Sequence, residues 1–232
     1  MSRRAVIVAL MIAAAVGILF GLYPRLDLEI ANLFYDPAGK NFPLRANSAL
    51  RYLREASSWL LVLFIVPSVI ALLIPRLRPW ISARAAIFLI ATLALAPGLL
   101  VNVVLKNHWS RPRPVAVVEF GGHERFVPWW DPRGECRKNC SFVSGETSSA
   151  FWTLAPAALA PASWRAFGYA AAVAFGAGMG VARMAMGAHF FTDVVFAGVF
   201  TFVVIVLLHG LIFRPRTAAS AAKAETPPKP GS

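Results

Sequence analysis

Six long apolar stretches divide this chain, and they constrain its fold more than any other feature. A helix that crosses a bilayer needs ~20 mostly apolar residues, because the membrane interior offers no water to satisfy an unpaired backbone. The stretches are residues 5–23, 59–74, 85–105, 148–162, 167–182 and 190–213. The sequence therefore predicts an all-α, polytopic membrane protein with six transmembrane helices, and the low charged content of 15% agrees with this class.

The first apolar stretch follows Arg3 and Arg4 directly, as the core of a secretory signal peptide would. It is longer than the usual signal core and lacks a clear small-residue cleavage site near its end, so we interpret it as an uncleaved first span. Residues 47–57 can form an amphipathic helix at the membrane interface. Pro97 and Gly98 predict a kink in the third span.

Arginines in the short loops predict the orientation, because cytoplasmic loops carry an excess of Lys and Arg. Six crossings from a cytoplasmic N-terminus place the arginines of every short loop in the cytoplasm, namely Arg76, Arg78, Arg84, Arg165, Arg214 and Arg216. Both termini are then cytoplasmic, and residues 24–58, 106–147 and 183–189 face outward. We expect one membrane domain, residues 1–216, followed by a disordered cytoplasmic tail, residues 217–232.

The net charge of +12 would suggest a nucleic-acid partner in a soluble protein. Here much of the charge flanks apolar stretches, where it fixes topology, and the rest lies in outward-facing polar clusters that can bind phosphate. We therefore expect the bilayer as a partner and no nucleic acid, and the sequence predicts no particular protein partner.

The first polar cluster, residues 106–114, reads KNHWSRPRP. Arg111 and Arg113 offer planar forks that bind phosphate in a bidentate manner, and Lys106 adds a point charge. An interfacial basic patch that holds anionic headgroups is the alternative interpretation.

The second cluster, Ser144, Gly145 and Glu146, opens the fourth predicted helix, and the N–H groups of a helix N-terminus bind anions. Simple capping explains the same residues equally well, with Ser144 as N-cap and an acid in the first turn.

The third cluster contains Arg183, His189 and Asp193. Asp193 lies four residues after His189, so on a helix it can accept the proton of one ring nitrogen and leave the other nitrogen as a nucleophile or base. Capping of the sixth helix by His189 and pairing of Asp193 with a loop arginine is the alternative. An acid inside an apolar stretch is costly, which favours a functional role.

The two cysteines, Cys136 and Cys140, lie in the outward-facing loop, where two thiols can form a disulfide. A metal site would need more ligands than the sequence supplies, so no metal is expected. Two unpaired thiols remain the alternative.

Together the clusters resemble the motifs K-x6-R-P, P-S-G-H and S-R-x5-H-x3-D of the type 2 phosphatidic acid phosphatase family of membrane lipid phosphatases. The first motif begins at Lys106 and has Arg113 as its arginine. The third motif is present at the family's spacing, although Ala182 replaces its serine. The second motif is altered, because Val143 replaces its proline and Glu146 replaces its histidine.

The resemblance implies a metal-independent, cofactor-free phosphatase that forms a phosphohistidine, which water then hydrolyses. His189 would be the nucleophile, oriented by Asp193. The phosphate oxygens would be held by Lys106, Arg113, Ser144, the Gly145 backbone and Arg183.

Glu146 occupies the position of the family's general acid. A protonated Glu can donate to the leaving oxygen if burial raises its pKa, whereas Lys106 and Arg183 would favour the carboxylate. His108 or His123 can supply the proton instead, or the leaving group can need little help, as with an anomeric sugar phosphate or a diphosphate.

The expected protein is thus a phosphatase of the bacterial inner membrane, with a periplasmic site capped by residues 121–139. The expected substrate is a phosphorylated membrane lipid. Lipid A is the leading candidate because a basic outer loop suits a polyanionic headgroup, and undecaprenyl diphosphate and phosphatidylglycerol phosphate follow. A lipid phosphotransferase and a non-catalytic lipid-binding protein are alternatives of other classes.

Overall fold

The computed structural model describes residues 3–213, and their regular structure is helical. Within this range there is no named strand, only two isolated bridges that join Asp36 to Asn41 and Val117 to Glu124. The prediction of an all-α fold is therefore confirmed. The predicted tail, residues 217–232, lies outside the described residues.

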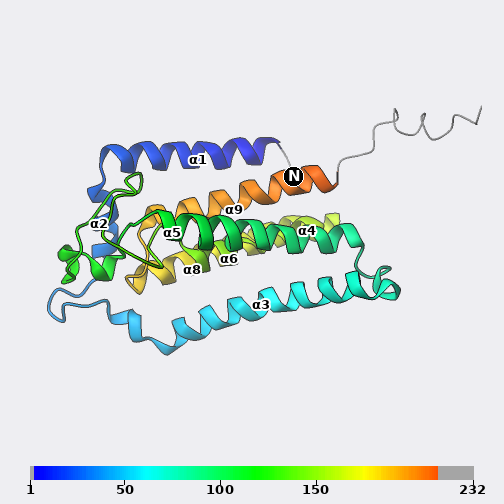
Figure 1. Cartoon of the computed structure of the whole chain (residues 1–232), viewed down its shortest axis with the longest axis horizontal. Coiled ribbons are helices and arrows are strands. Elements are labelled where there is room, and N and C mark those ends of the chain that lie inside the picture. Colours follow the sequence, from blue (N-terminus) through cyan, green and yellow to red (C-terminus); the bar gives the residue numbers. More distant parts are fainter. Residues whose placement is uncertain (1–2, 214–232) are drawn as a thin grey trace, which may run out of the picture.

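The longer helical segments run side by side in one bundle (Figure 1). They are α1 (Arg3–Leu22), α3 (Ser48–Leu73), α4 (Ala83–Leu93) continued by η3 (Ala94–Leu105) and α5 (Lys106–His108), α6 (Gly145–Phe151) followed by α7 (Leu154–Leu159), α8 (Ala162–Ala185) and α9 (Phe191–Ile212). Short elements complete the fold: α2 (Arg25–Asn32), η1 (Pro43–Ala46), η2 (Pro75–Leu77), η4 (Pro114–Ala116) and η5 (Val118–Phe120). The polar loop 109–144 and α2 lie together at one end, which we call the site end (Figure 1).

Four helices in the described part of the chain are long and apolar enough to cross a membrane: Arg3–Leu22, Ser48–Leu73, Ala83–His108 and Phe191–Ile212. The protein is thus a membrane protein, while the count of six spans stays a prediction. The two other segments, α6–α7 and α8, contain more small and polar residues because they contact other helices. Gly176 of α8 and Gly198 of α9 both pack against the Phe151 ring, where a Cβ would approach ring carbons to 2.5 and 2.9 Å.

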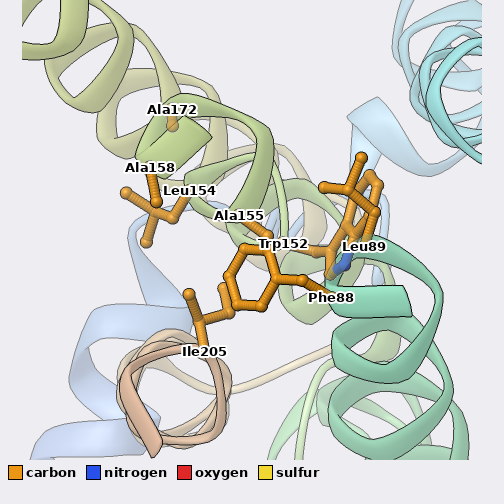
Figure 2. Packing of buried hydrophobic residues seen from close by; sticks show 8 residues of the cluster. All are labelled: Phe88, Leu89, Trp152, Leu154, Ala155, Ala158, Ala172 and Ile205. Carbon is orange, nitrogen blue, oxygen red and sulfur yellow. The ribbon is translucent and has the colours of Figure 1, made fainter. Parts of the chain in front are cut away.

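A buried apolar cluster joins these central segments to α4 and α9 (Figure 2). Trp152, between α6 and α7, is fully buried there beside Phe88, and its indole N–H donates to Thr92 Oγ1 at 2.9 Å. The partner satisfies the one polar group of the indole, so the large ring can occupy the centre of the bundle at little cost.

One local prediction needs correction. Residues 47–57 do not form a separate interfacial helix, because α3 starts at Ser48, with Asn47 as its N-cap, and continues without a break through the second span. Pro97 and Gly98, where the sequence predicts a kink, lie within a helix that runs from Ala83 to His108, and the kink itself stays a prediction. The chain widens into a π-helix there, and the Asn102 side-chain amide donates to the Pro97 carbonyl at 2.7 Å.

The polar loop is held to the bundle at several points. Within the loop a disulfide joins Cys136 to Cys140 and closes a short turn. Trp129 packs on Phe196 of α9 and donates its indole N–H to the Gly17 carbonyl of α1 at 3.2 Å. These contacts fix the loop over the ends of α5, α6 and α9, where the polar motifs lie.

Candidate active site

All three polar clusters meet at the site end of the bundle. Lys106 lies where η3 passes into α5, Glu146 lies in the first turn of α6, and Arg183 lies in the last turn of α8. Gly187 makes the turn from α8 to α9 with a φ of +62°, and a Cβ there would meet the Phe42 ring at 2.5 Å. This tight turn returns His189 towards the other two clusters.

His189 is fully buried, and its two ring nitrogens have different surroundings. Nδ1 lies 2.8 Å from the carbonyl oxygen of Ser141, which can only accept a hydrogen bond, so Nδ1 carries the proton. Nε2 of the neutral ring therefore has a free lone pair. This is the tautomer that a nucleophilic histidine needs.

Asp193 does not contact the imidazole at hydrogen-bond distance, since its Oδ2 lies 3.8 Å from Nδ1. The same oxygen accepts the Ser141 hydroxyl at 2.5 Å and the Phe190 N–H at 2.9 Å. Asp193 and His189 are thus joined through Ser141, whose hydroxyl donates to Asp193 and whose carbonyl lies at hydrogen-bond distance from His189. No sequence pattern marks Ser141, and sequence analysis missed it.

Arg111 is not a phosphate ligand, and its inclusion among the phosphate-binding candidates is corrected here. Its side chain is fully buried, and it donates to Asp193 Oδ1 at 2.6 Å, to Asp27 Oδ2 at 2.7 Å and to Thr192 Oγ1 at 2.8 Å. The guanidinium also lies over the Phe190 ring, 4.4 Å from its centroid. Its Nε donates to the Val127 carbonyl at 3.1 Å, so each of its three nitrogens is bound to a protein group and the side chain anchors α9 to α2.

The remaining cations, Lys106, Arg113 and Arg183, all lie near Glu146. Lys106 Nζ donates to Asn139 Oδ1 at 3.3 Å, and Arg113 donates to both the carbonyl and the side-chain oxygen of Asn139 at about 3.0 Å. Arg183 Nη2 lies 3.4 Å from Glu146 Oε1. A cavity of about 190 Å³ opens beside them, lined by Ser57, Ser58, Leu61, Asn102, Lys106, Gly145, Glu146 and Ser149.

Three buried polar atoms in the described residues have no hydrogen-bond partner, and all three belong to this group: His189 Nε2, Arg183 Nε and Glu146 Oε2. His189 Nε2 and Glu146 Oε2 lie 3.9 Å apart. Because buried polar groups are nearly always paired, three orphans in one place indicate a binding site for a polar ligand. A phosphate ester can occupy such a site, because the His189 lone pair faces its phosphorus, the Arg183 N–H donates to a phosphate oxygen and the Glu146 carboxyl lies near the ester oxygen.

Ser144 and Gly145 form the start of α6 beside this group. Ser144 is the N-cap, and its oxygen accepts the Thr147 hydroxyl at 2.7 Å. The capping interpretation is therefore realised, yet it leaves the Ser144 hydroxyl proton free to donate. The first N–H groups of a helix have no acceptor within it, so the Gly145 N–H also remains available for an anion.

Replacing Gly145 with Ala tests how closely this turn fits the site. A Cβ there would meet Asn102 Oδ1 at 2.8 Å and Lys106 Nζ at 3.0 Å, so the lysine must move away from Gly145. We expect Gly145→Ala to raise the KM for a phosphorylated lipid about tenfold, because a charge-assisted hydrogen bond is weakened. Gly178→Ala is the matched control on α8, where a Cβ meets nothing within 4 Å. Equal KM values for the two variants would contradict the close fit.

Glu146 is ionised in the free protein. Burial raises the pKa of its carboxyl, but the charges of Arg183 and Lys106 favour the carboxylate and hold that pKa below its usual range. The other proton donors considered from the sequence lie elsewhere: His108 and His123 are exposed, and His108 Nδ1 lies 2.8 Å from the Val104 carbonyl of its own helix. Among residues 3–213 no group of three His, Cys, Asp or Glu side chains is suited to a metal.

Comparison with known proteins places these residues in context. Residues 85–216 match the PAP2 superfamily. A lipid A 4′-phosphatase of Francisella tularensis subsp. novicida is 36% identical over 222 residues, which cover 93% of this chain and 99% of the relative. A lipid A 4′-phosphatase of Rhizobium leguminosarum is 33% identical, covering 83% of this chain and 89% of the relative. No solved structure matches the chain.

Proposed function

Because the chain belongs to the PAP2 superfamily, we propose that it is a bacterial membrane phosphatase that removes the 4′-phosphate of lipid A. The relatives named for this activity align with nearly the whole chain, including all three polar clusters. The observation that carries the proposal is the geometry of His189, whose protonated Nδ1 leaves Nε2 as a buried nucleophile beside Arg183 and Glu146.

In the first step, the Nε2 lone pair attacks the phosphorus, and the bond between phosphorus and the sugar oxygen breaks. Lys106, Arg113, Arg183, the Ser144 hydroxyl and the Gly145 N–H bind the phosphate oxygens and stabilise their charge. The Ser141 carbonyl holds the Nδ1 proton of the imidazolium, and Asp193 stabilises its positive charge. Water then attacks the phosphohistidine and releases phosphate, which restores the neutral ring.

Glu146 is assigned as the proton donor to the leaving sugar oxygen. Its carboxyl is ionised in the free protein, but a bound phosphate dianion neutralises the cations that lower its pKa. The pKa of Glu146 therefore rises when substrate binds, and the residue can carry a proton at the moment the bond breaks. In the second step the resulting carboxylate accepts a proton from the attacking water.

We expect Glu146→Gln to lower kcat on the lipid by about 100-fold or more, because an amide cannot donate this proton. Its KM should stay equal or fall, since a negative charge beside the bound anion is removed. In the wild type, kcat should fall as pH rises through the pKa of Glu146 in the complex. The pH profile of Glu146→Gln should lack this fall in kcat.

Two matched measurements separate this role from a structural one. Glu146→His places the family's residue at this position and should keep kcat within about tenfold of the wild type. A phosphate ester of p-nitrophenol needs no proton on leaving, so it should be hydrolysed by Glu146→Gln and the wild type at similar rates. An equal loss on both substrates would refute the assignment.

We place the site end on the periplasmic face, with both termini in the cytoplasm. Supporting this, Arg76 lies in η2 and Arg78 directly follows it, and η2 follows α3 at the opposite end of the bundle from the site (Figure 1). The test introduces Arg78→Cys or, in the outer loop, Arg137→Cys into a variant that lacks Cys136 and Cys140. Intact cells are then treated with a membrane-impermeant maleimide. Only the cysteine at position 137 should react.

The substrate is tested with purified protein in detergent and EDTA, measuring phosphate release from lipid A, undecaprenyl diphosphate and phosphatidylglycerol phosphate in parallel. Fast release from lipid A alone supports the proposal. Faster release from either of the other lipids would mean that this lipid, and not lipid A, is the substrate. If the folded protein released phosphate from none of them, the proposed phosphatase activity would be refuted.

A further inference from the structure

Three exposed arginines lie beside the phosphate site and have no part in the mechanism above. Arg45 lies in η1, and Arg51 and Arg54 lie in the first two turns of α3. All three belong to the site end of the bundle, where the positive-inside rule gives no reason for positive charge if this end is periplasmic.

The face of α3 that carries these arginines is the face that borders the site cavity. Residues three and four apart share a helix face, and Ser57, Ser58 and Leu61, which line the cavity, lie three, four and seven residues after Arg54. Ser57 Oγ also donates to the Arg54 carbonyl at 2.7 Å. Arg51 continues the same face one turn further from the cavity, about 10 Å along the axis from Ser58.

The arginines are close enough to act on the phosphate ligands electrostatically. The charge of Arg54 repels that of Arg183. Burial lowers the pKa of Arg113, and the nearby charge of Arg45 lowers it further. Positive potential therefore continues from the cavity along α3 and η1.

None of these three arginines is paired with a carboxylate. Within residues 3–213 none of them forms a salt bridge, not even with Glu55, which lies four residues after Arg51 in α3. Arg51 lies instead over the Tyr52 ring, 6.0 Å from its centroid. Unpaired guanidinium groups next to an anion site suit a further phosphate, which they bind in a bidentate manner.

We propose that Arg45, Arg51 and Arg54 form a second anion subsite, which takes the distal phosphate of a lipid whose headgroup carries two phosphates. Lys106, Arg113 and Arg183 hold the phosphate that is removed. The proposal rests on the proposed function, and lipid A fits it, because its disaccharide has a phosphate at each end. The subsite selects the bisphosphorylated lipid over the monophosphorylated one.

The test compares kinetics of the full-length protein on lipid A 1,4′-bisphosphate and on lipid A 4′-monophosphate, in micelles of an uncharged detergent. The wild type should favour the bisphosphate in kcat/KM by about tenfold or more, because a charge-assisted contact to the second phosphate is made. The Arg51→Gln/Arg54→Gln double variant should raise the KM for the bisphosphate by about tenfold and leave kcat unchanged. Its kinetics on the monophosphate should match those of the wild type, which also shows that the variant is folded.

The matched control is Arg76→Gln/Arg78→Gln, which removes the same charge just beyond the opposite end of α3. It should leave kcat and KM unchanged on both lipids. A KM rise of equal size on both lipids would assign the arginines to general attraction of anionic lipid and overturn the subsite. So would an unchanged KM on both. A wild type that hydrolyses neither lipid would instead overturn the proposed function, and the subsite with it.

Discussion

His189→Gln is expected to lower phosphate release from lipid A by about 10,000-fold or more, since removal of a covalent nucleophile costs rates of this size. Glutamine keeps a polar side chain beside the Ser141 carbonyl but has no lone pair on a basic nitrogen. The loss should fall on kcat, whereas KM should change little, because Lys106, Arg113 and Arg183 still bind the phosphate. The measurement is phosphate release in detergent with EDTA, with binding followed by retention of labelled lipid.

The exposed histidines of the polar loop supply the matched controls. His108→Gln and His123→Gln make the same chemical change away from the buried group and should keep kcat within about twofold, as surface substitutions usually do. A phosphorylated form of the wild type that is stable in base and labile in acid should accumulate at short times, and it should be absent from His189→Gln. If His189→Gln turned over lipid A near the wild-type rate, the assignment of His189 as the nucleophile would be refuted.

Arg111→Met is expected to be the most destabilising of these substitutions. It would leave the carboxylates of Asp27 and Asp193 buried, 2% and 0% exposed, without the cation that joins them. Breaking a buried ion pair by removing one partner costs about 3–5 kcal/mol. The variant should therefore unfold at a clearly lower temperature in detergent and lose activity, because Asp193 supports the Ser141 contact to His189.

The companion variant Asp27→Asn separates stability from activity. It removes the outer carboxylate and leaves Arg111 bound to Asp193, so kcat should stay closer to the wild type than in Arg111→Met. The matched control is Arg133→Met, since Arg133 pairs with Asp131 at 2.9 Å but is 80% exposed. Exposed pairs contribute little, so this control should keep the wild-type unfolding temperature. Equal midpoints for Arg111→Met and Arg133→Met would show that the buried cluster is not a stabilising unit.

The membrane character and the position of the chemistry were predictable from the sequence because both depend on local patterns. Apolar length along the chain indicated membrane helices, and four helices of the described part have that length. The spacing of Lys106, Arg113, Arg183 and His189 indicated one phosphate site, and the structure brings these side chains to the same end of the bundle. The segment α6–α7 and α8 were harder to assign, because helices that contact other helices need not be strongly apolar.

The roles of individual polar residues depended on packing between distant segments. Arg111 and Arg113 are both arginines that precede a proline, so residue type alone does not distinguish them, and only the motif spacing selected Arg113 as the phosphate ligand. Only the fold places Arg111 in the interior, between Asp27 and Asp193, which are 84 and 82 residues away in the chain. Ser141 and Asn139 likewise became visible only through their contacts.

The sequence by itself thus determined that this protein is a helical membrane protein whose polar motifs resemble those of a phosphatase family, since hydropathy and motif spacing are properties of short segments. Tertiary structure decided which nitrogen of His189 is free, which arginine is structural and which arginines remain unpaired. The physical reason is that the charge and hydrogen bonding of a buried group depend on partners that folding brings together from distant parts of the chain.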